Sequence, residues 1–155
     1  MMMIRVLIAD DHAVLRAGLR RLLDATPDMR VVADVGSGDD ILPALAREQV
    51  DVVVLDVSMP GAGFLQILSD LRHQHPDVRA IILSGHAEEE FADRAFAAGA
   101  AGYVAKDRTP EDLVAAVRRV VQGLPFASEG LAPRLRSNEP PGNTDLPSGP
   151  SSDPR

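Results

Sequence analysis

The feature that most constrains the fold is the segment VVVLDVSMPG at residues 52–61, where an unbroken apolar run ends in Asp56 and a Met-Pro-Gly turn follows. A short β-branched run bounded by turn residues is typical of a strand buried on both faces, as in parallel sheets flanked by helices. Asp56 is therefore expected at the carboxyl end of a buried strand, the edge where open α/β sheets bind ligands. On this stretch alone, a reacting group and a cap for the following loop are equally good interpretations of Asp56.

Apolar segments alternate with amphipathic ones along the first 123 residues. We expect strands at 3–9, 31–35, 52–55, 80–83 and 101–105, and helices at 12–26, 38–48, 64–75, 88–98 and 109–123. Pro43 fits the second helix only in about its first turn, because proline lacks the backbone N–H that later turns use. The fourth helix has a small apolar face, so we expect it to be the most loosely held. Five alternations of strand and helix with short connections predict a doubly wound parallel sheet.

Composition limits the functions open to the chain. Its 155 residues correspond to about one domain, and it contains no cysteine, which excludes disulfides and thiolate sites and fits a cytoplasmic protein. Its apolar runs fall far short of the ~20 residues that a transmembrane helix needs. The formal net charge of -7 argues against general affinity for nucleic acid, which depends on Lys and Arg. We therefore expect no membrane insertion and no direct nucleic-acid binding by this chain.

The composition changes after Gly123. Residues 124–155 hold seven of the twelve prolines, and beyond about residue 135 almost nothing apolar remains to be buried. The sequence therefore divides into a folded unit at 1–123 and a linker or tail at 124–155, which we expect to be disordered beyond about residue 135.

Polar residues follow four of the five expected strands. They are Asp10 and Asp11, Asp56, Ser84 and Lys106. Each has an ordinary explanation alone, since an Asp pair before a helix is commonly an N-cap and a serine at a strand end is commonly a turn residue. Their coincidence at one edge of a sheet is hard to produce by chance. The only lysine among sixteen basic residues lies in this set, which suggests a place where a compact ammonium is required.

The residue types at this edge indicate phosphoryl chemistry. Converging carboxylates repel one another unless a hard cation lies between them, and oxygen ligands of this kind suit Mg²⁺. One carboxylate can then accept a phosphoryl group, while the metal and an ammonium neutralise charge on the equatorial oxygens. Lys106 would supply the ammonium, and Ser84 would supply a hydroxyl donor. No metal-ligand pattern is evident in the four histidines.

These motifs, in this order, resemble the receiver domain of bacterial two-component response regulators over about residues 3–123. The matching positions are Asp10 and Asp11, the segment around Asp56, Ser84 with Gly85, Tyr103, and Lys106 followed by a helix near Pro110. The resemblance implies an α/β, flavodoxin-like (CheY-like) fold. Its five-stranded parallel sheet would have the strand order 2-1-3-4-5, with helices on both faces.

The resemblance also implies the chemistry of the site. Asp56 would be phosphorylated by a sensor histidine kinase, and Lys106 would pair with the phosphoryl group or with Asp56 itself. Mg²⁺ would be held by Asp10, Asp11, Asp56 and the main-chain carbonyl of Ser58. The protein would catalyse its own phosphorylation and slow dephosphorylation, without being a conventional enzyme.

A conformational switch is a further implication of the resemblance. In the family, a hydroxyl residue at the position of Ser84 moves toward the phosphoryl group, and an aromatic residue at the position of Tyr103 turns inward. These movements remodel the surface of the fourth helix and fifth strand. Ser58 and His86 occupy positions that modulate the rate of dephosphorylation, although an exposed loop histidine is an equally good interpretation of His86.

The segment at 123–135 resembles the one that follows the receiver in NarL/FixJ (LuxR-type) regulators, before the linker to a helix-turn-helix domain. We favour a fragment of a longer transcription regulator over a stand-alone receiver, with DNA bound by the missing domain and with homodimerisation on phosphorylation. One departure from the family is Phe64, where most relatives have glycine. A large apolar side chain near the site entrance puts the docking of a kinase in doubt.

Three functions from different classes are consistent with these residues. The leading hypothesis is a phosphorylation-controlled signalling switch. The second is a pseudo-receiver that acts as a phosphorylation-independent interaction module, which Phe64 slightly favours and the complete acidic set with Lys106 opposes. The third is a Mg²⁺-dependent phosphohydrolase, for which neither a substrate pocket nor a general acid for product release is evident in the sequence.

Overall fold

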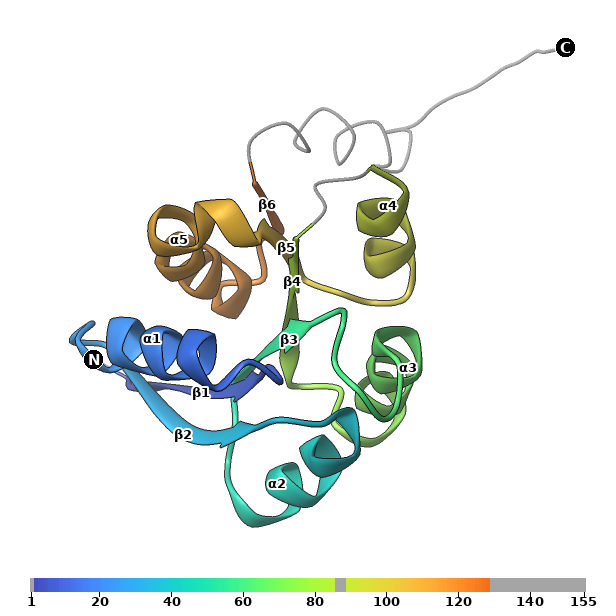
Figure 1. The fold of residues 1–155 in the computed structure, drawn as a ribbon, viewed down its shortest axis with the longest axis horizontal. Helices are drawn as coiled ribbons and strands as arrows, with labels where there is room; N and C mark the ends of the chain where they lie inside the picture. The colour runs from blue at the N-terminus through green and yellow to red at the C-terminus, as the bar shows by residue number, and fades with distance from the viewer. Residues whose placement is uncertain (1, 86–88, 129–155) are drawn as a thin grey trace, which may run out of the picture.

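The computed structural model describes residues 2–85 and 89–128, which form a parallel sheet covered by helices on both faces (Figure 1). The strands are β1 (Ile4–Ala9), β2 (Met29–Val35), β3 (Val52–Asp56), β4 (Arg79–Ser84), β5 (Gly102–Ala105) and β6 (Phe126–Ala127). The helices are α1 (Ala13–Asp24), α2 (Ile41–Arg47), α3 (Phe64–Gln74), α4 (Glu89–Ala97) and α5 (Thr109–Val121), with short 3₁₀ segments η1 (Gly38–Asp40) and η2 (Lys106–Arg108).

The sheet has the strand order β2-β1-β3-β4-β5-β6, and all of these neighbouring pairs are parallel. The predicted doubly wound fold with the order 2-1-3-4-5 is therefore confirmed, and a short sixth strand extends it. No helix in the described part of the chain is long and apolar enough to cross a membrane.

Two apolar layers hold the helices against the sheet. α1 and α5 cover one face, and α2, α3 and α4 cover the other (Figure 1). Every residue of β3 is buried, as its unbroken apolar sequence predicts. Val53 and Leu55 belong to the layer under α2–α4, whereas Val52 and Val54 belong to the layer under α1 and α5. Asp56 is the first polar side chain that this strand presents at its end.

Pro43 shortens the second helix at its start rather than interrupting it. α2 begins at Ile41, so Pro43 lies in the first turn, where a missing N–H breaks no intrahelical hydrogen bond. The residues before α2 form η1, where the side chain of Ser37 accepts a hydrogen bond from the Asp39 N–H at 3.2 Å.

The sixth strand continues the sheet beyond residue 123. β6 pairs with β5, placing Phe126 opposite Gly102 and Ala127 opposite Tyr103. The next residue, Ser128, is 1% exposed, and its Oγ accepts a hydrogen bond from the Ala105 N–H at 3.0 Å. A two-residue strand carries no hydrophobic period, so the sequence pattern does not indicate it.

We predict that Ser128→Ala destabilises the domain by about 1–3 kcal/mol, because it leaves the buried Ala105 N–H without its acceptor. Urea denaturation of both proteins measures the difference. The same substitution at the half-buried Ser69 of α3 should be neutral or stabilising, because alanine is the better helix former. Equal effects at the two positions would contradict a specific role for Ser128.

A bidentate ion pair fastens α5 to the turn before β2. The Nη2 and Nε atoms of Arg118 lie 3.0 and 3.2 Å from the two carboxylate oxygens of Asp28. The hydrogen bonds from Arg118 lower the pKa of Asp28. A lowered folded-state pKa stabilises the protein above the unfolded-state pKa, and this contribution is lost as the pH falls through the folded-state pKa.

We therefore predict that Asp28→Asn lowers the melting temperature at neutral pH and that the loss shrinks to nothing toward about pH 2. Thermal melts across this range provide the measurement. Arg118→Gln should give a similar loss at neutral pH, and the double variant should lose little more than either single variant. A loss that persists unchanged at acid pH would exclude the ion pair as its cause.

Candidate functional site

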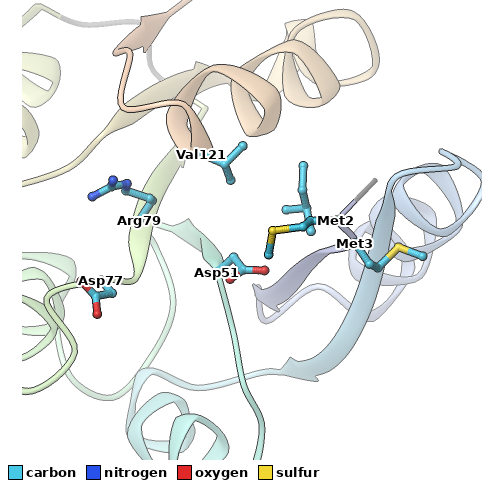
Figure 2. A pocket seen from close by; sticks show the side chains of 7 residues that line it. Met2, Met3, Asp51, Asp77, Arg79 and Val121 are labelled. Atoms are coloured by element: carbon cyan, nitrogen blue, oxygen red, sulfur yellow. The ribbon is translucent and has the colours of Figure 1, made fainter.

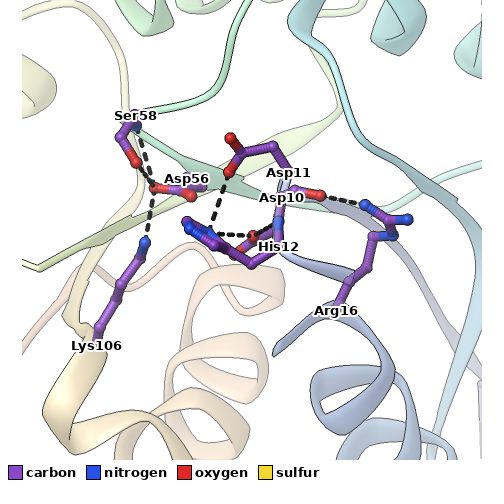
Figure 3. Close-up of polar contacts among 7 residues, drawn as sticks. All are labelled: Asp10, Asp11, His12, Arg16, Asp56, Ser58 and Lys106. Atoms are coloured by element: carbon purple, nitrogen blue, oxygen red, sulfur yellow. Dashed lines mark hydrogen bonds and ion pairs between the residues drawn. The ribbon is translucent and has the colours of Figure 1, made fainter. Parts of the chain in front are cut away.

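Two neighbouring strands bring carboxylates to the carboxyl edge of the sheet. Asp10 follows β1 and is fully buried, and Asp56 ends the adjacent β3 with 1% of its surface exposed. Asp11 and His12, which precede α1, are exposed. Ligand atoms of these four residues all lie within 4.8 Å of one another (Figure 3). The structure thus gathers the three carboxylates expected to hold a metal and adds a histidine.

The two carboxylate oxygens of Asp56 have different surroundings. Oδ1 accepts hydrogen bonds from the Ser58 N–H at 3.1 Å and the Ser58 hydroxyl at 3.0 Å, and Lys106 Nζ lies 3.1 Å from it (Figure 3). Oδ2 is buried and has no hydrogen-bond partner within residues 2–85 and 89–128. One oxygen is therefore held in place, while the other is open to form a new bond.

Asp10 shows the same asymmetry. Its Oδ1 accepts a hydrogen bond from the His12 N–H at 2.7 Å, whereas its Oδ2 is buried with no partner in the described part of the chain. A buried carboxylate oxygen without a partner is costly unless a cation or donor compensates for it. Two such oxygens, from Asp10 and Asp56, together with the exposed Asp11, form an all-oxygen donor set of the kind that Mg²⁺ takes. The residues therefore fit a divalent cation.

The remaining expected site residues lie at the ends of β4 and β5. Ser84 ends β4 and is fully buried, and Lys106 follows β5 at the start of η2. Tyr103 is fully buried in β5, in the apolar layer under α2–α4. The structure brings Lys106 to Asp56, and Ser84 lies at the same edge of the sheet. His86 lies outside the described residues.

The loop that carries Ser58, between β3 and α3, is fastened to the segment after β2. Gly38 N donates to the Pro60 carbonyl at 3.0 Å, and Ala62 N donates to Asp39 Oδ1 at 3.2 Å. Gly61 has a φ of +88°, and a Cβ there would lie 3.0 Å from Asp39 Oδ2. We call these contacts the loop clamp. Sequence reasoning missed the clamp because it joins segments about 23 residues apart, and its only signal is the glycine in each segment.

Residues 6–118 match the family described as the response regulator receiver domain. The chain belongs to this family. Its relatives include the response regulator UvrY of Escherichia coli (strain K12), 36% identical over 86% of this chain and 61% of UvrY. GacA of Pseudomonas aeruginosa is 39% identical over 86% of this chain and 62% of GacA. A solved LuxR-family response regulator from Aurantimonas sp. SI85-9A1 superposes with a TM-score of 0.81 at 31% identity, covering 87% of this chain and 96% of that one.

These comparisons confirm the predicted resemblance to receivers of the NarL/FixJ type. The receiver spans about three fifths of the length of the curated relatives it matches. Similarity to the response regulators UvrY and GacA agrees with the expected link to two-component signalling. Similarity to the transcriptional regulatory protein DegU of Brevibacillus brevis agrees with the expected link to transcription regulation.

An arginine on α1 holds the backbone of Asp10 in the receiver. Arg16 Nη1 donates to the main-chain carbonyl of Asp10 (Figure 3). Arg16 Nε lies 3.2 Å from Asp34 Oδ1 on β2. Arg20 also pairs with Asp34. These contacts tie the end of β1 to α1 and β2, so that the backbone of Asp10 is held in place. The sequence pattern did not indicate this contact.

Phe64 of the receiver packs toward α4. Its ring lies edge-on to that of Phe91, with centroids 6.4 Å apart and an interplanar angle of 62°. Both rings are half-buried against the apolar layer under α2–α4. The side chain that departs from the family pattern therefore joins the start of α3 to α4.

A separate hollow of about 340 Å³ lies at the opposite, amino-terminal edge of the sheet (Figure 2). It is lined by Met2, Met3, Ile4, Asp51, Asp77, Arg79 and Val121. Its polar groups are partly used in the fold, since Asp51 accepts a hydrogen bond from the Arg5 N–H at 2.9 Å and Arg79 Nε donates to Val120 O at 3.2 Å. The hollow thus lies at the opposite edge of the sheet from the site carboxylates of Asp10 and Asp56.

We predict that Gly61→Ala destabilises the receiver by about 1–3 kcal/mol, because alanine at positive φ is strained and its Cβ collides with the loop clamp. Gly63→Ala is the matched control, because a Cβ there has no heavy atom within 4 Å and the residue has a φ of -69°. Urea denaturation compares the two variants with the native chain. Equal stability of both variants would show that the clamp does not constrain the loop.

Proposed function

We propose that this receiver is a phosphorylation-controlled signalling switch of a two-component system, in which a sensor histidine kinase donates a phosphoryl group to Asp56. The observation that carries the proposal is the asymmetry of the Asp56 carboxylate. Three donors from Ser58 and Lys106 surround Oδ1, while Oδ2 is buried and has no hydrogen-bond partner among the described residues. A fixed carboxylate with one open oxygen has the arrangement that a nucleophile requires.

The transfer forms a bond between Asp56 and phosphorus and breaks the bond between phosphorus and the donor, whose electron pair leaves with the donor. Asp56 would act as the nucleophile, and Ser58 would hold its second oxygen. Lys106 provides a positive charge beside the equatorial oxygens as the phosphoryl group arrives. Ser84 would provide a hydroxyl donor. The positions of these side chains at one edge of the sheet support the roles.

Asp10, Asp11 and Asp56, with the main-chain carbonyl of Ser58, would hold Mg²⁺. The metal, when bound, would neutralise charge on the phosphoryl oxygens. The unpartnered oxygens of Asp10 and Asp56 support this assignment, because a cation is the partner that both lack among the described residues. The receiver would also catalyse its own dephosphorylation, with Ser58 and His86 affecting the rate.

The conformational response would pass to α4 and β5. Among the described side chains of α4, the fully buried ones are the small Ala92 and Ala95, and its larger apolar side chains, Phe91 and Phe96, are only half-buried. Weakly held elements are the ones that move in switches. Tyr103 is fully buried, which supports an inward position as one of its two states. Ser84 at the end of β4 would couple the phosphoryl group to this surface.

The output would be control of dimerisation or of a DNA-binding domain, because UvrY and GacA extend beyond the region that the receiver matches. With a formal net charge of -7, this chain would not bind DNA itself. The site of action would be the cytoplasm. A pseudo-receiver with a constitutive interaction remains the alternative, and it predicts partner binding that is unchanged in Asp56→Asn.

We predict that incubation with acetyl phosphate and Mg²⁺ adds the mass of one phosphoryl group to the native chain and none to Asp56→Asn. The exposed Asp77→Asn is the matched control and should be labelled like the native chain. Intact-protein mass spectrometry with and without Mg²⁺ provides the measurement. If the native chain binds Mg²⁺ but is labelled neither by acetyl phosphate nor by a phosphorylated kinase domain, the switch is excluded and the pseudo-receiver favoured.

A further inference from the structure

His12 lies against the acidic cluster although it is no part of the expected magnesium site. Its Nδ1 lies 3.1 Å from Asp11 Oδ1 and 3.4 Å from Asp10 Oδ1 (Figure 3). The His12 N–H also donates to Asp10 Oδ1 at 2.7 Å, which fixes the backbone from which the imidazole extends. Its side chain is 63% exposed, so burial in the core does not explain its orientation.

These separations are those of ligands that share one metal ion. Donor atoms about 2.1 Å from a metal are roughly 3.0 Å apart at adjacent octahedral positions and roughly 3.4 Å apart in a tetrahedron. His12 Nδ1 has these distances to two carboxylates at once. Small side-chain rotations would bring the whole set, which spans 4.8 Å, around a single ion.

The two buried, unpartnered oxygens of Asp10 and Asp56 are an independent sign of a ligand at this cluster. The carboxylates that carry these oxygens each have a ligand atom within 4.8 Å of one of His12, so a cation bound between the carboxylates would be near the imidazole. Mg²⁺ prefers oxygen ligands, whereas an imidazole combined with carboxylates suits Zn²⁺, Ni²⁺ and related dications of the transition series.

We propose that His12 is a fourth protein ligand that lets this site bind a transition-metal dication in competition with Mg²⁺. The inference rests on the proposed Mg²⁺ site, because both metals would use Asp10, Asp11 and Asp56. His12 would add affinity for Zn²⁺ and Ni²⁺ and little for Mg²⁺. A receiver with a transition metal bound would be withheld from Mg²⁺-dependent phosphorylation, so its response would depend on metal supply as well as on the kinase.

A different explanation of the same contacts is an ion pair between a protonated His12 and the two aspartates. It makes the opposite prediction, because removing an ion-pair partner would not weaken the binding of Zn²⁺ or Ni²⁺. The two explanations are therefore separated by metal binding at a fixed neutral pH.

The test is calorimetric titration of untagged protein with Zn²⁺, Ni²⁺ and Mg²⁺. Because any imidazole is a potential ligand for Zn²⁺ and Ni²⁺, the background is a variant with His73, His75 and His86 all changed to alanine. In that background, His12→Ala and His12→Gln should each weaken Zn²⁺ and Ni²⁺ binding by about tenfold or more while changing the Mg²⁺ affinity by less than about twofold. Mn²⁺ should broaden the ring-proton NMR signals of His12. Melting temperatures verify that the variants are folded. Because the side chain of His12 is exposed, its substitution should change the melting temperature little.

The outcomes distinguish the inference from the proposed function. Unchanged Zn²⁺ and Ni²⁺ affinities in both His12 variants, with phosphorylation of Asp56 intact, would overturn the inference alone. His12-dependent Ni²⁺ binding without phosphorylation of Asp56 would support the inference and count against the switch. Failure of the background protein to bind any of the three metals would overturn both.

Discussion

The structure of this receiver depends on compensating the negative charge of two carboxylates that the sheet buries. Asp10 and Asp56 lie at the ends of neighbouring strands, where apolar layers on both faces exclude water. Two such charges at close range repel each other strongly in a medium of low polarity. Lys106 and the Ser58 donors compensate one oxygen of Asp56, and the His12 N–H compensates one oxygen of Asp10. The remaining buried oxygens, which have no partner among the described residues, are where a bound cation would add most to this compensation.

The elements around this edge of the sheet hold Asp10 and Asp56 in fixed positions. β3 is buried throughout, so Asp56 cannot move away without displacing the central strand. Arg16 holds the carbonyl of Asp10 from the α1 side, and the loop clamp holds the residues after β3 against η1. Rigid support of this kind keeps reacting groups within a fraction of an ångström of their working positions, which catalysis by positioning requires.

The parts of the molecule that sequence reasoning could predict are those with a local cause. The β3 run predicts burial on both faces, and the alternation of strands with helices predicts which strand ends meet. From these, the gathering of Asp10, Asp56 and Lys106 follows. Resemblance to a family then supplies the strand order, because spacing alone does not determine it. Pro43 conflicts with a helical pattern, but the structure places it in the first turn of α2, where the backbone N–H has no intrahelical partner.

What could not be predicted depends on contacts between distant segments. β6 is too short to show a period, and it forms because β5 otherwise has an unpaired edge that Ser128 and its neighbours can reach. The loop clamp needs two glycine-containing turns to meet in space, and neither turn alone indicates the other. The contact of His12 with Asp10 and Asp11 depends on the direction of one exposed side chain at the start of α1. Periodicity carries no information on that direction.

The distribution of support around the site has a consequence for signalling. On the β1–β3 side, buried strands and the loop clamp hold Asp56, and the Arg16 contacts hold the neighbouring Asp10. On the β4–β5 side, α4 fully buries only small side chains among those described, and the contact between Phe64 and Phe91 is a half-buried aromatic pair. A phosphoryl group on Asp56 would therefore have rigidly held elements on one side and more weakly held elements on the other. In the switch that we propose, the displacement would follow the lower free-energy cost and appear at α4, and the contact between Phe64 and Phe91 would carry part of it to α3.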